Sequence, residues 1–248
     1  MMELLSNPQV WASLLTLTVM EIVLGIDNIV FISVIVSRLP AHIADRARKI
    51  GLALALVFRI ALLAALSWLV GLTAPLFSAF DLDFSWRDLI LIGGGLFLLV
   101  KATHEIHKGI EGEDEELASN PAAAAARGFA GVIAQIIVID LVFSIDSIIT
   151  AIGMAQHIEI MVAAVILAMM VMYAASGPVS GFIQRHPTTK MLALSFLLLI
   201  GVSLIADGLG FHIPRGYIYF AMAFSAGVEV VNVLAKSRKQ KAEHASSK

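Results

Sequence analysis

Two short stretches of this sequence place pairs of carboxylates inside long apolar runs. The first is Glu21-Ile-Val-Leu-Gly-Ile-Asp-Asn28, within an apolar run from about residue 10 to residue 36. The second is Asp140-Leu-Val-Phe-Ser-Ile-Asp-Ser147. In both stretches the two acids are six residues apart, and a small polar residue follows the second acid. An ionisable side chain within a membrane-spanning segment costs about 2.5–3.5 kcal/mol on insertion scales, so such residues are functional candidates.

The charge of these acids must be compensated inside a membrane. Four uncompensated carboxylates would cost about 10–14 kcal/mol on that scale, comparable with the whole stability of a typical domain. Protonation, a basic side chain or a metal ion would each remove this cost. Arg59 and Lys101 also lie within apolar runs. We interpret both as candidate charge partners, while contact of Arg59 with lipid and snorkelling of Lys101 to the inner surface stay open.

The oxygen-rich composition of the two stretches indicates a hard divalent cation as the ligand. Carboxylate, amide and hydroxyl oxygens suit Mg²⁺, Ca²⁺ or Mn²⁺, whereas Cu⁺ and Zn²⁺ favour thiolates, and this chain has no cysteine. The alternative is a buried polar network that locks helices together. The predicted metal ligands are Glu21, Asp27, Asn28, Asp140, Asp146 and Ser147.

The spacing within each stretch constrains how one ion could be bound. On an unbroken helix, residues six apart lie about 120° apart around the axis and about 9 Å along it. The two acids of one copy therefore cannot bind the same small cation from a straight helix. Either the helix opens near Gly25 and Ser144, or each acid pairs with an acid of the other copy. We expect the helix to open.

A third group, His104, Glu105 and His107, follows an apolar run and precedes the acidic residues 111–116. It is a candidate for capture of metal ions at the inner face of the membrane. The simpler interpretation is that these side chains solvate the end of a helix.

Composition identifies an integral membrane protein whose surroundings are the lipid bilayer. The chain is 59% hydrophobic and 15% charged, with a mean hydropathy of +0.89, whereas soluble domains are about 45–50% apolar and about 25% charged. The lack of cysteine excludes disulfides and thiolate sites. The run Gly93-Gly-Gly95 lacks the lysine of a phosphate-binding loop, so we expect it to serve close helix packing. We expect no prosthetic group and no nucleic-acid partner.

Apolar runs and basic residues predict an all-α protein with seven spans. With the N-terminus outside, thirteen of the seventeen Lys and Arg residues fall on the inner side. Only Arg87 and Arg215 fall on the outer side, and cytoplasmic loops are the ones enriched in Lys and Arg. The sequence therefore predicts an N-out, C-in topology. The predicted spans are residues 9–36, 50–72, 88–106, 129–155, 159–183, 190–207 and 215–235.

The two acidic stretches begin equivalent parts of an internal repeat. They lie in the first and fourth spans, so each copy contains three helices, and an odd number inverts the second copy in the membrane. We therefore expect a single transmembrane domain over residues 1–248 that is divided into segments. These are repeat one (9–106), an acidic cytoplasmic loop (107–128), repeat two (129–207), an extra helix (215–235) and a basic cytoplasmic tail (236–248).

The chain resembles the TerC family of bacterial membrane proteins, which belongs to a superfamily of LysE-like exporters. The resemblance rests on the two acidic stretches, with further support from Lys101-Ala-Thr-His-Glu-Ile-His107 and Gly216-Tyr-Ile-Tyr-Phe-Ala-Met-Ala-Phe224. It implies export of Mn²⁺ across the inner membrane, with the six predicted ligands forming the metal site. Some relatives carry CBS-type and CorC-type domains after the last span, and we expect this chain to be a short form without them.

We therefore predict a membrane transporter and not an enzyme, one that exports Mn²⁺ by alternating access and is driven by protons or the membrane potential. A non-transporting partner of the secretion or metallation machinery, in contact with a translocon, stays open as an alternative. So does an intramembrane aspartyl protease in which Asp27 and Asp146 share a proton, although the residues around them fit that class poorly.

Overall fold

The computed structural model of the protein describes residues 8–37, 39–79, 82–111, 121–152 and 158–246. It is an α-helical bundle with one short β-hairpin. The helices are α2 (Pro8–Val36), α3 (Ala41–Ala64), α4 (Leu66–Gly71), α5 (Trp86–Glu111), α6 (Pro121–Ile152), α7 (Ile158–Arg185), α8 (Pro187–Gly208) and α9 (Arg215–Ser246). The hairpin consists of β1 (Pro75–Ala79) and β2 (Leu82–Ser85), which pair antiparallel.

Six of these helices are long and apolar enough to cross a membrane: α2, α5, α6, α7, α8 and α9. The α3 helix is of similar length, but its charge, which includes Arg48, Lys49 and Arg59, keeps it out of this group. The prediction of an all-α membrane protein is therefore confirmed. Seven spans would require α3 to cross the membrane as well, and this stays a prediction.

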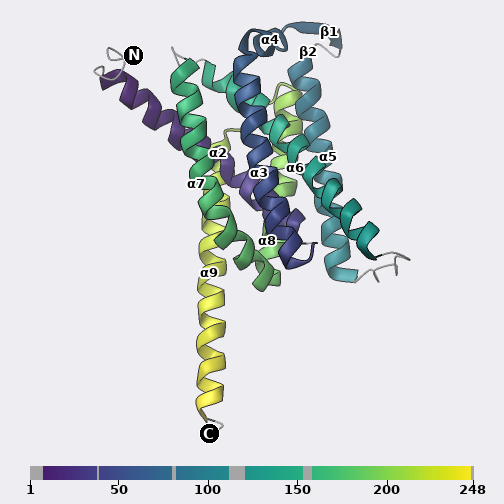
Figure 1. Ribbon diagram of the computed structural model, residues 1–248, viewed down its shortest axis with the longest axis vertical. Coiled ribbons are helices and arrows are strands. Elements are labelled where there is room, and N and C mark those ends of the chain that lie inside the picture. Colours follow the sequence, from purple (N-terminus) through teal and green to yellow (C-terminus); the bar gives the residue numbers. More distant parts are fainter. Residues whose placement is uncertain (1–7, 38, 80–81, 112–120, 153–157, 247–248) are drawn as a thin grey trace.

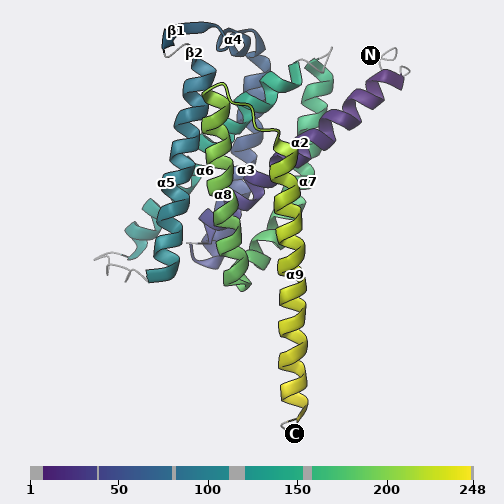
Figure 2. The ribbon, with the colours of Figure 1, turned by 180° about the vertical axis from the view of Figure 1, so that it is seen from behind.

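Successive long helices run in alternating directions along the bundle (Figure 1). The α2 helix descends from the N-terminus in this view, whereas α6 rises, so the two acidic stretches lie on helices of opposite direction. The β-hairpin caps the end of the bundle at which α5 begins and α8 ends. We refer to this as the hairpin end. The α9 helix starts near the same end and extends well beyond the bundle at the other (Figure 2).

The bundle is built from close helix pairs, and in the pair α5 and α8 the two backbones approach each other directly. A methyl group on Gly95 would lie 2.5 Å from the carbonyl oxygen of Gly201, and one on Gly201 would lie 3.0 Å from that of Gly95. On a neighbouring face of α5, a methyl group on Gly94 would lie 2.5 Å from Val142 of α6. The expected close packing is therefore confirmed for these two glycines of the run. It is wrong for Gly93, whose added methyl group would meet no described atom within 4 Å.

The pair Gly95 and Gly93 provides a matched test of this contact. We expect Gly95→Ala to destabilise the protein by about 1–3 kcal/mol, because backbone atoms of α8 cannot move aside as a side chain would. Gly93→Ala should be neutral or stabilising, since alanine is favoured over glycine in helices by about 1 kcal/mol. Thermal unfolding of both variants in detergent measures the difference. Equal midpoints would contradict the close contact.

The expected opening of the helices is wrong. Both α2 and α6 are continuous, and they pass through Gly25 and Ser144 without interruption. Gly25 instead allows close packing of α7, because a methyl group there would lie 2.1 Å from the sulfur of Met172. No opening is needed, since the two acids of each stretch have different surroundings, as described below.

Several boundaries also differ from those expected. The α3 helix begins at Ala41 and includes residues 41–49, which the predicted spans 9–36 and 50–72 leave as a connection. In this part Asp45 pairs with Lys49 at 2.7 Å and also with Arg48. Such pairs, three or four residues apart, support a helix. The predicted acidic loop, residues 107–128, is shorter than expected, because α5 continues to Glu111 and α6 begins at Pro121. Residues 112–120 lie outside the described part of the chain. The α9 helix likewise continues through the predicted tail to Ser246.

Candidate functional site

The first acids of the two stretches share one guanidinium group in the middle of the bundle. Arg59 of α3 donates from Nη1 to Oε2 of Glu21 at 2.7 Å. It also donates from Nη2 and Nε to Oδ1 of Asp140, at 2.9 and 3.2 Å. Each of the three residues is less than 5% exposed. Arg59 thus has embedded acids, and not lipid, as its neighbours.

Two further side chains complete this group, which we term the Arg59 cluster (Glu21, Asn28, Arg59, Asp140 and Ser144). Asn28 donates from Nδ2 to Oδ1 of Asp140 at 3.1 Å, and Ser144 donates to Oδ2 at 3.3 Å. The carboxylate of Asp140 therefore accepts hydrogen bonds from α2, α3 and α6. A metal ion could bind between Glu21 and Asp140 only if Arg59 moved away.

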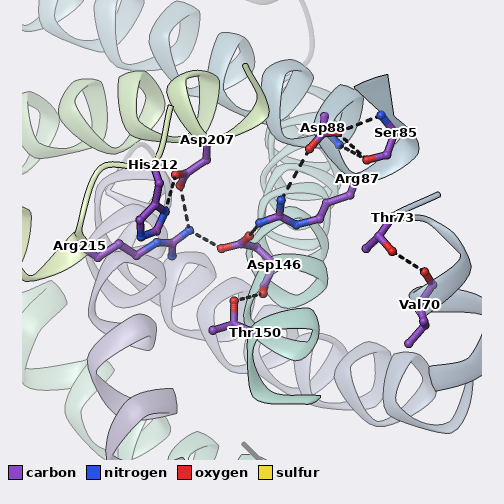
Figure 3. Close-up of polar contacts among 10 residues, drawn as sticks. All are labelled: Val70, Thr73, Ser85, Arg87, Asp88, Asp146, Thr150, Asp207, His212 and Arg215. Carbon is purple, nitrogen blue, oxygen red and sulfur yellow. Dashed lines mark hydrogen bonds and ion pairs between the residues drawn. The ribbon is translucent and has the colours of Figure 1, made fainter. Parts of the chain in front are cut away.

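The second acid of the second stretch lies nearer the hairpin end, between two other arginines. Asp146 of α6 accepts hydrogen bonds from Arg87 at the start of α5 and from Arg215 at the start of α9 (Figure 3). Arg215 also lies 3.9 Å from Asp207 of α8, which is 3.2 Å from Nδ1 of His212. Asp146 is buried, whereas the side chains of Arg87 and Arg215 are 25% and 19% exposed. This network joins the ends of α5, α8 and α9 to α6.

A polar cavity of about 380 Å³ borders this network. Its apolar wall is one face of α2 that includes Met20 and Leu24. We refer to this cavity of about 380 Å³ as the polar cavity. Its polar lining includes Arg87, Asp146, Ser147, Thr150, Asp207 and Arg215.

The second acid of the first stretch, Asp27, is close by but separate. It is 3% exposed, and its Oδ1 has no hydrogen-bond partner among the described residues. A small cavity of about 10 Å³ lies against it, bordered also by Ser203, Arg215 and Tyr219. This is about the space of one water molecule. Arg215 and Tyr219 line both cavities, so Asp27 and Asp146 lie on either side of the same pair of α9 side chains.

The six predicted ligands therefore occupy three places. Glu21, Asn28 and Asp140 belong to the Arg59 cluster, Asp27 borders the small cavity, and Asp146 and Ser147 border the polar cavity. Across the described residues, no group of three or more His, Asp or Glu side chains is arranged to hold a metal ion. Joint ligation of one ion by all six stays a prediction.

The other candidates lie apart from these sites. The ammonium group of Lys101 lies 5.8 Å from the ring centroid of Phe97 on the same helix, and no described ion pair joins it to a carboxylate. His104 and His107 are exposed, whereas Glu105 is 5% exposed. His107 lies 3.3 Å from Glu111, one helical turn further on. The described geometry therefore does not unite His104, Glu105 and His107 into one metal-binding collar.

Sequence reasoning missed the roles of Arg87, Arg215 and Tyr219. The sequence analysis used Arg87 and Arg215 only to predict the topology, and it did not single out Tyr219. One signal could have identified the two arginines: they are the only basic residues that the predicted topology places outside, where Lys and Arg are normally scarce.

Comparison with known proteins identifies the family. Residues 6–244 match the model of the integral membrane protein TerC family. The chain belongs to this family. Among its TerC relatives, the UPF0053 inner membrane protein YgdQ of Escherichia coli K12 is 50% identical over 230 residues, which cover 93% of this chain and 95% of YgdQ. The UPF0053 inner membrane protein YoaE of the same strain is 51% identical over 238 residues, which cover 95% of this chain and 45% of YoaE.

The UPF0053 protein YegH of the same strain is 51% identical over 234 residues, 94% of this chain and 44% of YegH. This TerC protein thus spans less than half the length of YoaE and YegH, and nearly all of YgdQ. No solved structure matches it. The names of the relatives and the six candidate spans identify a multi-pass protein of the inner membrane.

Proposed function

We propose that this TerC protein exports a divalent cation from the cytoplasm by alternating access, and that the cation is Mn²⁺, as the family resemblance implies. One observation carries the proposal: buried carboxylates of the two matching stretches border two cavities that share Arg215 and Tyr219 in their lining, Asp27 the small cavity and Asp146 the polar cavity. Carboxylate and hydroxyl oxygens are ligands that suit Mn²⁺ and Mg²⁺. Ionisable residues in spanning helices commonly mark an ion pathway.

The arginines give this proposal an electrostatic mechanism. A carboxylate left bare inside the protein is unfavourable, so an ion can leave Asp146 only if another positive charge replaces it. Arg87 and Arg215 have this role in the conformation described here, because both pair with Asp146 at the wall of the polar cavity. We therefore assign this conformation to the state after release. Binding of the next ion from the inner side would require Arg215 to leave Asp146.

Helix packing supports an inverted repeat as the basis of the conformational change. The first helix of each predicted repeat packs against the second helix of the other: α2 against α7, and α6 against α3. The third helices, α5 and α8, pack against each other. Such an arrangement is common among secondary transporters, whose binding sites lie at the repeat interface. In this proposal α3 also crosses the membrane, which brings the number of spans to seven, and the hairpin end faces outside. Protons or the membrane potential drive transport.

Inverted membrane vesicles test this function, because export from the cytoplasm appears in them as uptake. We expect vesicles that contain the protein to accumulate Mn²⁺ faster than vesicles without it, under an imposed pH gradient or membrane potential. Mg²⁺ and Ca²⁺ measured in parallel give the selectivity. Uptake equal to that of control vesicles for every cation would contradict export. Co-purification with translocon subunits would then favour a role as a partner of the secretion machinery.

A further inference from the structure

We propose that Ser203 of α8 and Tyr219 of α9 form, together with Asp27 of α2, a binding site for one divalent cation. All three residues border the small cavity of about 10 Å³. They come from three different helices, two of which carry none of the ligands predicted from the acidic stretches. The binding site stands on these contacts alone, and its part in transport rests on the function proposed above.

The polar atoms at this cavity have unused hydrogen-bonding capacity. Oδ1 of Asp27, the hydroxyl of Ser203 and the hydroxyl of Tyr219 are buried and have no hydrogen-bond partner among the described residues. Asp27 and Ser203 are 3% and 4% exposed. Buried polar atoms are normally paired, so three unpaired oxygens around one cavity indicate an occupant that supplies the missing interactions.

The chemistry of these oxygens favours a cation over an anion. A carboxylate and two hydroxyls can each direct a lone pair at a hard cation, and Mn²⁺ and Mg²⁺ take oxygen ligands at short distances. The volume of the cavity is about that of one water molecule, so it has room for one ion at most.

Arg215 is the positive charge nearest to this site. It lies close enough to Asp27 to interact with it electrostatically, and it lines the small cavity. Its guanidinium, however, binds Asp146 and lies 3.9 Å from Asp207, so two carboxylates offset its charge. The hydroxyl of Tyr219 lies next to this guanidinium without the geometry of a hydrogen bond. It remains available to a cation beside Asp27.

Binding of Mn²⁺ to the purified full chain, followed by electron paramagnetic resonance, tests the site. Ser203→Ala and Tyr219→Phe each remove one hydroxyl and should weaken Mn²⁺ binding about 10-fold or more. Two matched controls should bind as the wild type. Ser33→Ala removes another buried, unpaired hydroxyl on α2 that borders neither cavity, and Tyr217→Phe removes an exposed hydroxyl of α9.

A change of metal preference keeps the test decisive if loss of a hydroxyl also perturbs folding. The chain has no cysteine, so Ser203→Cys introduces a unique thiol. If Ser203 contacts the ion, this variant should bind Mn²⁺ more weakly and Cd²⁺ more tightly than the wild type, because thiolates favour soft metals. Unchanged preference, or wild-type Mn²⁺ affinity in Ser203→Ala and Tyr219→Phe, would overturn the site and leave the cavity to water alone. Binding that depends on Ser203 without vesicle uptake would keep the site and contradict export.

Discussion

Replacement of Arg59 by leucine is expected to destabilise the folded protein by about 3–5 kcal/mol, the effect of removing one partner from a buried ion pair. Arg59 neutralises part of the charge of Glu21 and Asp140 and donates hydrogen bonds to both. Without it, both carboxylates would remain buried, and Asn28 and Ser144 would still donate to Asp140 but not to Glu21. Thermal or denaturant unfolding in detergent measures the loss. Lower yield of folded protein in the membrane should accompany it.

A compensating variant distinguishes the charge effect from loss of packing. Combining Arg59→Leu with Glu21→Gln and Asp140→Asn removes the charges of all three residues, and most of the lost stability should return. Arg59→Lys should be intermediate, since lysine keeps the charge but lacks the forked geometry that reaches both acids. If Arg59→Leu unfolds at the wild-type temperature, Arg59 does not hold the cluster together.

Loss of the charges at Asp27 and Asp146 is expected to have the largest effect on transport. Removing groups that only orient metal ligands typically lowers metal affinity about 10- to 100-fold, so removing two proposed ligands should lower the rate of Mn²⁺ uptake at least about 100-fold. The double variant Asp27→Asn/Asp146→Asn keeps the size of both side chains. Asp27→Asn removes a buried carboxylate without a partner on one oxygen, so the fold should tolerate it. Asp146→Asn removes the acid that Arg87 and Arg215 share, so thermal unfolding of the double variant in detergent must accompany the transport measurement.

An acid at the same end of the bundle provides the control for this variant. Asp83 lies on the exposed hairpin, where it accepts a hydrogen bond from Ser78 and borders neither cavity. Asp83→Asn should therefore transport Mn²⁺ as the wild type does. Equal loss in both variants would attribute the effect to surface charge, and equal retention would exclude Asp27 and Asp146 from the pathway.

The membrane class and the buried acids could be predicted because both are local properties of the sequence. Apolar runs of sufficient length specify spanning helices, and Asp140 and Asp146 stand out because so few charged residues interrupt them. The family also followed from these stretches, since the motifs themselves carry the resemblance.

The partners of the acids could not be predicted, because they depend on which helices pack together. Arg59 lies between α2 and α6 only because α3 packs against α6, and Arg215 reaches Asp146 from a helix outside the predicted repeats. The expected opening at Gly25 assumed that both acids of one stretch bind the same ion. The structure gives Glu21 a cationic partner and leaves Asp27 beside a separate cavity, so the helix stays intact.

The most direct test of export is Mn²⁺ flux in liposomes that contain only the purified protein. With a pH gradient or a membrane potential imposed, we expect Mn²⁺ to cross the membrane in the wild type and in Asp83→Asn, but not in Asp27→Asn/Asp146→Asn. This result would place the pathway at the two acids without any partner protein. Absence of flux for Mn²⁺, Mg²⁺ and Ca²⁺ in a folded wild-type protein would contradict the proposal.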